Sequence, residues 1–200
     1  MADFLYDIGK VLLDFDFESS LSRLLPSEIE DSHTTLSRLL DKKDEFEAGR
    51  ISVDDYTNWA IETLETTATV DEFHTSWRNI FEPNLPMWET VRKLHATGHR
   101  LILFSNTNAI HCPWVFEEYS DFSLFHGAVL SFEVQEIKPH AKIYQHAIEQ
   151  FDLNPQKTLY IDDLPANIAT GKQLGFRTHQ YDLKNHGAFE TWLSNELTSS

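Results

Sequence analysis

The sequence predicts an α/β protein, in which a doubly wound, Rossmann-like parallel sheet forms the core and carries an inserted helical cap. Three observations support this fold class. From residue 84 onward, short apolar segments alternate with helical segments, which is typical of βαβ units and of a parallel sheet covered on both faces. Another short apolar segment lies at residues 3–7. Between these parts, residues 17 to about 82 place apolar residues at helical spacing without strand-like alternation.

The expected elements follow the chain in order. Residues 3–7 form the first buried strand. In the helical region, Gly49 closes one segment, and Ser52 with Asp55 three residues later marks the start of the next helix. Pro139 suits the first turn of a later helix. The remaining segments predict a helix at 85–98, a strand at 99–106, a helix near 109–119, a strand at 127–134, a helix at 138–153, a strand at 157–164, a helix at 165–176, a strand at 177–181 and a helical tail.

The composition suits one sizeable core with a smaller insertion. The chain has 200 residues, 41% of them hydrophobic, and we expect a core of residues 1–13 and 84–200 with a cap of residues 14–83. The 16 basic and 32 acidic residues give a formal charge of −16, which repels nucleic acid phosphates and anionic lipid. We therefore expect neither a nucleic acid partner nor membrane binding.

The cellular context is predicted from cysteine content and apolar segments. Cys112 is the single cysteine of the sequence, which excludes an internal disulfide and fits a reducing compartment. No apolar stretch approaches the length of a membrane span, and the N-terminus lacks the layout of a secretory signal. We expect a cytoplasmic protein, a monomer or a homodimer, with a small molecule as its substrate.

Polar residues follow four of the expected strands. In open α/β sheets, ligands bind beyond the carboxyl ends of the strands, so these residues are candidates for one common site. They are Asp7 after the first strand, Ser105, Asn106 and Thr107 after the second, Lys138 shortly beyond the third, and Asp162 with Asp163 after the fourth.

Each of these residue types has a use in phosphoryl transfer. A carboxylate such as Asp7 can attack phosphorus or carbon and divide one hard displacement into two easier steps. Asp7 and Asp162 together can hold Mg²⁺, which screens the repulsion between two anions and orients them. Ser105 and Asn106 can bind phosphate oxygens, and Lys138 can balance the negative charge. The set describes metal-assisted phosphoryl transfer through an aspartyl-phosphate.

Each residue also has a structural explanation. Asp7 alone could be a turn residue, and Lys138 alone could be a solvated surface lysine. The pair Ser105–Asn106 and the residue Asp163 could each cap a helix. Capping alone does not readily explain all of them in this order, each at or shortly beyond the end of an apolar strand. The combination therefore favours an active site.

The motifs resemble those of the haloacid-dehalogenase-like hydrolase superfamily over nearly the whole chain. The four matching segments are "FLYDIGKVL", "LILFSNT", "IKPHAKIY" and "LYIDDLPANI", and the helical region resembles the superfamily's small helical cap. The resemblance implies Mg²⁺ as cofactor and Asp7 as nucleophile. It further implies metal ligation by Asp7, the Gly9 backbone carbonyl and Asp162, phosphate binding by Ser105, Asn106 and Thr107, charge stabilisation by Lys138, and support from Asp163 and Asn167.

Gly9 departs from the superfamily pattern. Phosphatases of the superfamily commonly have a second Asp there, which protonates the leaving oxygen and then activates water. The Asp-x-Gly variant occurs in a subgroup that resembles the bacterial α-D-glucose-1-phosphate phosphatase. We therefore expect a sugar phosphate, such as a sugar-1-phosphate, as substrate. Since general acid catalysis contributes about 10²–10⁴-fold, we also expect slow turnover of esters with poor leaving groups.

Two other functions remain open. Some members of the superfamily are dehalogenases, in which the Asp attacks carbon without a metal, and these usually have an aromatic residue in place of Gly9. A protein of the same fold that only binds a metabolite or a partner is the second alternative. It would have lost one acid, yet Asp7, Lys138 and Asp162 are all present.

Other side chains carry weaker signals. Lys10, next to the first motif, has no explanation in the sequence. Cys112 precedes a proline and has no evident base partner, and the histidines lack the spacing of a zinc site. Residues that select the substrate are expected within 14–83.

Overall fold

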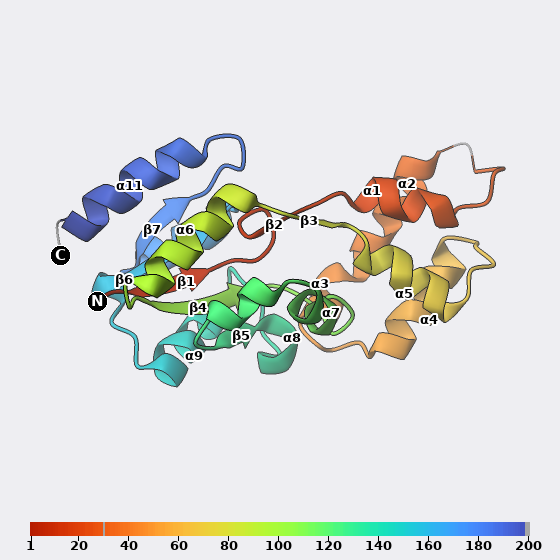
Figure 1. Ribbon diagram of the computed structural model, residues 1–200. Helices are drawn as coiled ribbons and strands as arrows, with labels where there is room; N and C mark the ends of the chain where they lie inside the picture. The colour runs from red at the N-terminus through yellow and green to blue at the C-terminus, as the bar shows by residue number, and fades with distance from the viewer. Residues whose placement is uncertain (30, 199–200) are drawn as a thin grey trace.

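A computed structural model, which describes residues 1–29 and 31–198, contains a five-stranded sheet (Figure 1). Its strands are β1 (Asp3–Tyr6), β4 (Arg100–Ser105), β5 (Ala128–Leu130), β6 (Thr158–Asp162) and β7 (Arg177–Gln180). They lie in the order β5-β4-β1-β6-β7, and neighbours run parallel. The first strand of the chain is therefore the central one.

Helices cover both faces of this sheet. They are α6 (Leu85–Ala96), α7 (His111–Glu118), α8 (Ser131–Val134), α9 (Ala141–Phe151), α10 (Pro165–Gln173) and α11 (His186–Thr198), with the 3₁₀ helices η3 (Ser120–Leu124) and η4 (Pro155–Lys157). In Figure 1, α6 and α11 lie on one side of the sheet and α9 on the other. The doubly wound α/β fold class is confirmed. In the described part of the chain, no helix has both the length and the apolar character needed to cross a bilayer.

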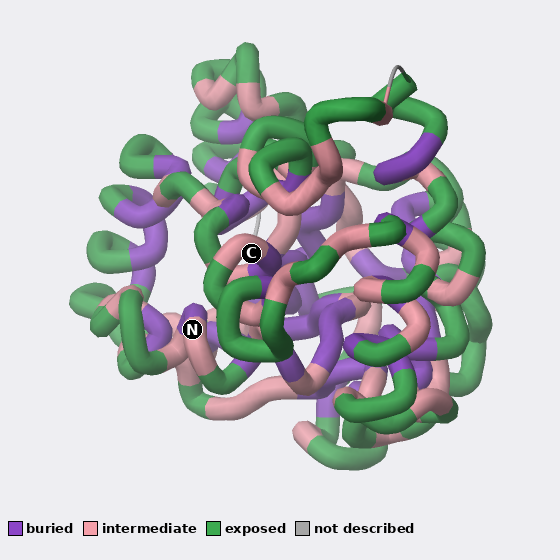
Figure 2. Tube along the Cα trace, turned by 90° about the vertical axis from the view of Figure 1, so that its right-hand side faces the viewer, coloured by how far each residue is buried: buried purple, intermediate pink, exposed green. Residues whose placement is uncertain are grey.

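Alternating side chains build one core on each face of the sheet. On β1, Phe4 and Tyr6 belong to one core and Leu5 to the other, and none of the three is exposed. The first core includes Trp88 of α6 and Phe189 of α11, whereas the second includes residues of α9 and α10. Figure 2 shows the buried segments in the interior and the exposed segments around them. Because both faces are covered, the strands β1, β4, β5 and β6 are largely apolar runs, which made them predictable.

Two short antiparallel strands, β2 (Leu13–Phe15) and β3 (Phe81–Pro83), lead away from the sheet and back to it. The sequence predicts no strand between residues 17 and 82. This prediction is wrong at its end, because β3 begins at Phe81. A strand of three residues is too short to show alternation, so its signal is absent. The expected boundaries at 13/14 and 83/84 adjoin this pair of strands, and the division into core and cap stays a prediction.

A helical insertion occupies the chain between β2 and β3. Its elements are α1 (Phe17–Leu21), η1 (Ser22–Leu24), α2 (Ser32–Ser37), η2 (Arg38–Lys42), α3 (Lys43–Glu47), α4 (Val53–Thr63) and α5 (Val70–Arg78). Phe46, Tyr56 and Trp77 form part of a core of its own, which Ile110 joins from the sheet part. In Figure 1, α1, α2, α4 and α5 lie at the end of the molecule opposite α11.

Helix ends in the insertion follow the rules of capping. The Ser52 Oγ accepts a hydrogen bond from the Asp55 N–H at 3.1 Å, and α4 begins directly after Ser52, as predicted. Thr69 and Glu72 form a reciprocal capping box at the start of α5. Gly49 follows α3 with a φ of +64°, a conformation that favours glycine.

The expected strand at 127–134 is only half formed. β5 ends at Leu130, and the following residues form the short helix α8. The Ser131 Oγ donates to the Thr107 carbonyl oxygen at 3.0 Å and accepts from the Thr107 N–H at 2.9 Å. These two bonds tie the chain to the loop after β4, and the chain leaves the sheet at Leu130.

Pro139 does not lie in the first turn of a helix, so this expectation is wrong. α9 begins only at Ala141, with His140 as the residue before it. The side chain of Asn106 binds both the N–H and the carbonyl oxygen of Lys138. Because these bonds hold the backbone just before Pro139, the helix begins after the proline.

One histidine connects the helical insertion to the sheet part. The ring of His111, at the start of α7, stacks on the ring of Trp77 in α5, with 5.5 Å between the centroids. Its Nε2–H donates to the Trp77 carbonyl oxygen at 3.0 Å, and its Nδ1 accepts from the Asn108 side chain at 3.1 Å. Both ring nitrogens are thus satisfied in the neutral form. Burial lowers the pKa of His111 to about 3.

We expect His111 to make the folded state less stable in acid. The folded protein keeps the ring neutral, whereas the unfolded chain takes up a proton below about pH 6.5. This contribution is complete above that pH and is lost as the pH falls. Between pH 6.5 and 5, the wild type should lose about 2 kcal/mol of unfolding free energy relative to His111→Gln.

Urea unfolding at a series of pH values measures this difference. His146→Gln, which changes an exposed histidine, is the matched control. A difference between the wild type and His111→Gln that stays constant with pH would contradict the assignment of a neutral His111 ring in the folded protein.

Candidate active site

The carboxyl ends of the strands bring three charged side chains into contact. The Lys138 Nζ lies 3.0 Å from the Asp7 Oδ1 and 2.6 Å from the Asp162 Oδ2, and it donates to the Phe104 carbonyl oxygen at 2.8 Å. Asp7 directly follows β1, and its N–H continues the sheet by donating to the Ile161 carbonyl oxygen at 3.0 Å. Lys138 is 2% exposed and Asp162 is fully buried. These ion pairs are therefore shielded from water.

Hydrogen bonds fix the orientation of the Asp162 carboxylate. The Tyr160 hydroxyl donates to Oδ2 at 2.6 Å, and the Leu164 N–H donates to Oδ1 at 2.9 Å. The Asn167 Nδ2 lies 3.0 and 3.1 Å from the two oxygens, in the supporting place that the resemblance implies. Tyr160 is not among the predicted residues. Its place two positions before Asp162 on the same strand puts both side chains on one face, which was a usable signal.

Asn106 positions Lys138 from the loop after β4. Its Oδ1 accepts from the Lys138 N–H at 2.8 Å, and its Nδ2 donates to the Lys138 carbonyl oxygen at 2.9 Å. The Thr107 N–H donates to Ser131. The Asn106 side chain and the Thr107 N–H are thus already used inside the protein. Phosphate binding by this loop stays a prediction.

Ser105 is buried next to Asp7; burial raises the pKa of that carboxyl, and the side-chain hydrogen bond of Ser105 opposes this rise. The alternative explanation of this loop as a helix cap does not hold. The Asn108 Oδ1 accepts from the Ile110 N–H at 3.1 Å and from the His111 N–H at 3.0 Å at the start of α7. Asn108 therefore binds the free N–H groups at the start of α7, and Ser105 lies at the site beside Asp7.

Burial and crowding of charge shift the pKa values of the cluster. Burial raises the pKa of Asp7 to about 7, although the Lys138 ammonium opposes this and Asp162 adds to it. Burial, followed by the Asp162 charge, also raises the pKa of Asp163. For Lys138, burial favours the neutral form, but the carboxylates of Asp162 and Asp7 outweigh it and raise the pKa. The cluster holds more carboxylates than one ammonium balances.

The cluster fits a divalent cation. Asp7, Asp162 and Asp163 each offer a carboxylate oxygen, and these three atoms lie within 4.8 Å of one another. Oxygen ligands suit Mg²⁺, and a charge of +2 would balance the two carboxylates that Lys138 leaves uncompensated. Gly9, whose carbonyl is a further ligand implied by the resemblance, pairs with Leu13 in the turn after Asp7.

The ring of Phe15 lies beside Gly9. A Cβ at position 9 would come within 3.3 Å of the Phe15 Cε1. Lys10 holds Phe15 there, because its Nζ donates to the Phe15 carbonyl oxygen at 2.8 Å, pairs with Asp14 and lies 4.3 Å from the ring centroid. This structural role of Lys10 is not visible in the sequence, and position 9 supplies no acid to the site.

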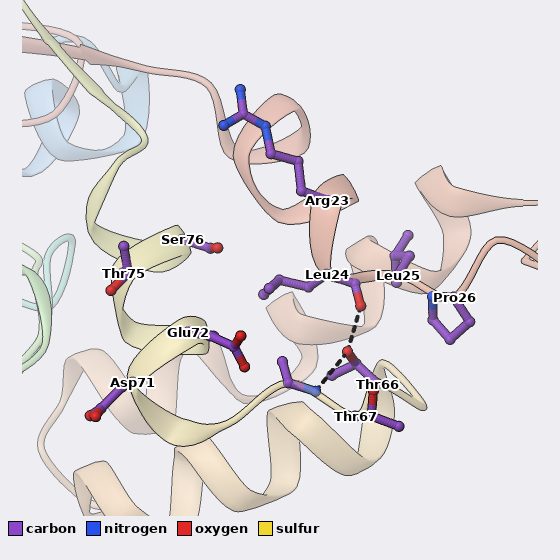
Figure 3. A pocket seen from close by; sticks show the side chains of 11 residues that line it. Arg23, Leu24, Leu25, Pro26, Thr66, Thr67, Asp71, Glu72, Thr75 and Ser76 are labelled. Carbon is purple, nitrogen blue, oxygen red and sulfur yellow. Dashed lines mark hydrogen bonds between the residues drawn. The ribbon is translucent and has the colours of Figure 1, made fainter.

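An open groove in the helical insertion is a weaker candidate (Figure 3). Thr66 in its wall donates to the Leu24 carbonyl oxygen at 2.5 Å and accepts from the Ala68 N–H at 3.2 Å. Glu72, also in the wall, belongs to the capping box of α5. These polar groups are used within the insertion, and none of the predicted site residues lines the groove.

A second groove reaches the carboxylate cluster. Asp163 lies in its wall, together with Lys10, Gln180 and Lys184. Asp163 is half-buried, so it takes part in the cluster and also faces the groove.

Cys112 is buried, and burial raises the pKa of its thiol to about 12, which excludes a thiolate nucleophile.

The comparison with known families agrees with this geometry. Residues 22–175 match the haloacid dehalogenase-like hydrolase family, which is more than half of the chain. The chain belongs to this family. The resemblance stated from the four motifs is thereby confirmed at the level of the family.

One curated protein and two solved structures illustrate which members of the family the chain resembles. D-ribitol-5-phosphate phosphatase of Bacteroides thetaiotaomicron is 26% identical over 189 residues, which cover 88% of this chain and 89% of the relative. Among solved structures, a HAD family enzyme of the same organism matches with a TM-score of 0.79 at 23% identity, over 92% of this chain and 94% of that one. A complex of that enzyme with magnesium and inorganic phosphate matches with a TM-score of 0.75 at 21% identity, over 92% and 95%. The narrower resemblance to glucose-1-phosphate phosphatases stays a prediction.

We expect Lys138→Met to destabilise the protein strongly at neutral pH in the absence of added metal. The substitution leaves Asp7 and Asp162 buried beside each other without a cation, a situation that costs about 3–5 kcal/mol. Urea unfolding in EDTA measures the loss. Lys142→Met, in which the lysine side chain is 83% exposed, is the control and should change stability by less than about 0.5 kcal/mol. Equal stabilities of the two variants would show that Lys138 does not hold the carboxylates.

Proposed function

We propose that the protein is a Mg²⁺-dependent phosphatase that hydrolyses a small phosphorylated metabolite through an aspartyl-phosphate. The observation that carries the proposal is the contact of Asp7 with Lys138, beside Asp162 and Asp163, at the carboxyl edge of the sheet. Membership of the hydrolase family and a phosphatase relative that spans most of the chain support it. The solved HAD structures that contain magnesium and inorganic phosphate support the choice of metal.

In this proposal, Asp7 is the nucleophile. One of its carboxylate oxygens forms a bond to phosphorus while the bond from phosphorus to the leaving oxygen breaks, and water then hydrolyses the aspartyl-phosphate. The sheet and Lys138 hold the carboxylate in a fixed place, and the ammonium favours its charged form. Asp7, Asp162 and the Gly9 carbonyl would hold Mg²⁺, which when bound screens the repulsion between carboxylate and phosphate.

The substrate that we propose is a sugar phosphate or a sugar-alcohol phosphate. The D-ribitol-5-phosphate phosphatase supports the sugar-alcohol class. A sugar-1-phosphate remains the narrower prediction, because its hemiacetal oxygen is a better leaving group and depends less on the acid that Gly9 lacks. The three carboxylates suited to a metal favour phosphate over a haloacid. A cytoplasmic location and a monomeric or dimeric state stay predictions.

We expect Mg²⁺-dependent phosphate release that requires Asp7. A panel of sugar and sugar-alcohol phosphates with one aryl phosphate should show release with Mg²⁺ and none with EDTA. Asp7→Asn should lower the rate by about 10³-fold or more, because the nucleophile is removed. Asp14→Asn, in which the side chain is 52% exposed, is the control and should stay active.

Two outcomes would contradict this function. Release that persists in Asp7→Asn would exclude Asp7 as nucleophile. A folded wild-type protein that binds Mg²⁺ but releases no phosphate from any ester would favour a protein that only binds a phosphorylated ligand.

A further inference from the structure

The proposed reaction needs a proton donor that position 9 does not supply. When the ester of an ordinary alcohol is cleaved, the leaving oxygen needs a proton, since an alkoxide is a poor leaving group. Gly9 has no side chain, and the space beside its Cα is next to Phe15. Lys138 is already engaged with Asp7, Asp162 and a backbone carbonyl. A side chain that donates this proton would come from another part of the chain.

The end of α3 brings the helical insertion into direct contact with the edge of the sheet. α3 packs against α8, and Figure 1 shows it at the boundary between the insertion and the sheet part, near α7 and α8. A Cβ at Gly49 would lie 2.2 Å from the Phe132 carbonyl oxygen, so the turn after α3 rests on the backbone of α8. Lys138 follows α8 shortly afterwards along the chain. The turn therefore contacts the segment of the chain that leads to Lys138.

Glu47, the last residue of α3, has a buried carboxyl with an incomplete set of partners. Its side chain is 11% exposed, and the Lys43 Nζ lies 3.2 Å from its Oε2. Within the described residues, Oε2 accepts no hydrogen bond of good geometry. A buried polar oxygen without such a bond is costly, and ligand binding is one reason for it to persist.

Electrostatic interactions link this carboxyl to the catalytic cluster. Burial is the largest influence and raises the pKa of Glu47, while the ammonium groups of Lys43 and Lys138 oppose it and Asp44 adds to it. Because the Lys138 ammonium is among the charges that influence this carboxyl, Glu47 lies within electrostatic reach of the lysine that contacts Asp7. Burial, followed by the Glu47 charge, raises the pKa of the Tyr56 hydroxyl. The net effect raises the pKa of Glu47, so this carboxyl holds a proton more readily than an exposed glutamate does.

We propose that Glu47 is the general acid of this enzyme and replaces, from the helical insertion, the acid that Gly9 lacks. This inference rests on the proposed function. The Glu47 O–H protonates the leaving oxygen as its bond to phosphorus breaks and the Asp7 oxygen forms the new bond. The leaving group departs as a neutral alcohol, and Glu47 is left as a carboxylate. It regains a proton from the water that hydrolyses the aspartyl-phosphate.

The test compares an alkyl ester with an aryl ester in Glu47→Gln. Nitrophenol is acidic enough to leave without a proton, whereas the alcohol of ribitol 5-phosphate is not. Glu47→Gln should lower kcat/KM for ribitol 5-phosphate, or for the best alkyl phosphate of the panel, by about 10²-fold or more. It should change kcat/KM for 4-nitrophenyl phosphate by less than about 3-fold. Both kcat/KM values report the steps up to departure of the leaving group, so they do not depend on the later hydrolysis of the aspartyl-phosphate.

Glu45→Gln, on the exposed side of the same helix, is the matched control and should leave both values unchanged. Urea unfolding checks that the variants are folded. If Glu47→Gln does not fold, Glu47→Asp takes its place, because it keeps the carboxyl but shortens its reach. It should lower the alkyl value at least about tenfold more than the aryl value.

Each other outcome overturns the proposal. Equal losses for both esters in a folded variant would give Glu47 a structural role only, and no loss would give it none. A wild type that cleaves the aryl ester but no alkyl ester has no working general acid. If the wild type cleaves neither ester, the proposed phosphatase function fails as well, whereas normal wild-type activity with an unaffected Glu47→Gln refutes this inference alone.

Discussion

The buried ion pairs of Lys138 with Asp7 and Asp162 are the interaction on which the rest of the site depends. Two carboxylates that are almost free of water can lie side by side only if a cation lies between them, because each carries a large desolvation cost. Lys138 supplies that cation, and Asn106 holds its backbone from the neighbouring loop. The lysine thereby fixes the carboxyl of Asp7, which we propose as the nucleophile, and still leaves an excess of carboxylate charge for Mg²⁺.

The fold provides what this arrangement requires. The strand that precedes Asp7 is central and flanked on both sides by parallel strands, so the residue that we propose as nucleophile follows a strand that is held on both edges. The contacts of the helical insertion with the sheet part include the turn at Gly49 on Phe132 and the stacking of Trp77 on His111. The insertion can therefore deliver a side chain such as Glu47 to a site whose other members come from the sheet.

The sequence predicts the part of this site that depends on local signals. Asp7 and Asp162 come directly after apolar strands, and parallel strands bring such ends together, so their proximity follows from the pattern. The partners of Asn106 and the burial of Glu47 depend on contacts between distant segments. Glu47 lies among charged residues on a short helix and looks like part of a solvated face, and nothing local shows that this face meets the sheet. The sequence does not predict strand β3 for another reason, because three residues are too few to show alternation.

The most direct test of the central claim is a crystal structure of the protein with Mg²⁺ and beryllium fluoride, which mimics a phosphoryl group on a carboxylate. We predict the beryllium on an oxygen of Asp7, Mg²⁺ bound by Asp7 and Asp162, and Lys138 still in contact with Asp7. Beryllium fluoride bound elsewhere, or a cluster that takes up no Mg²⁺, would contradict the account of Asp7 as the nucleophile of a metal-dependent phosphatase.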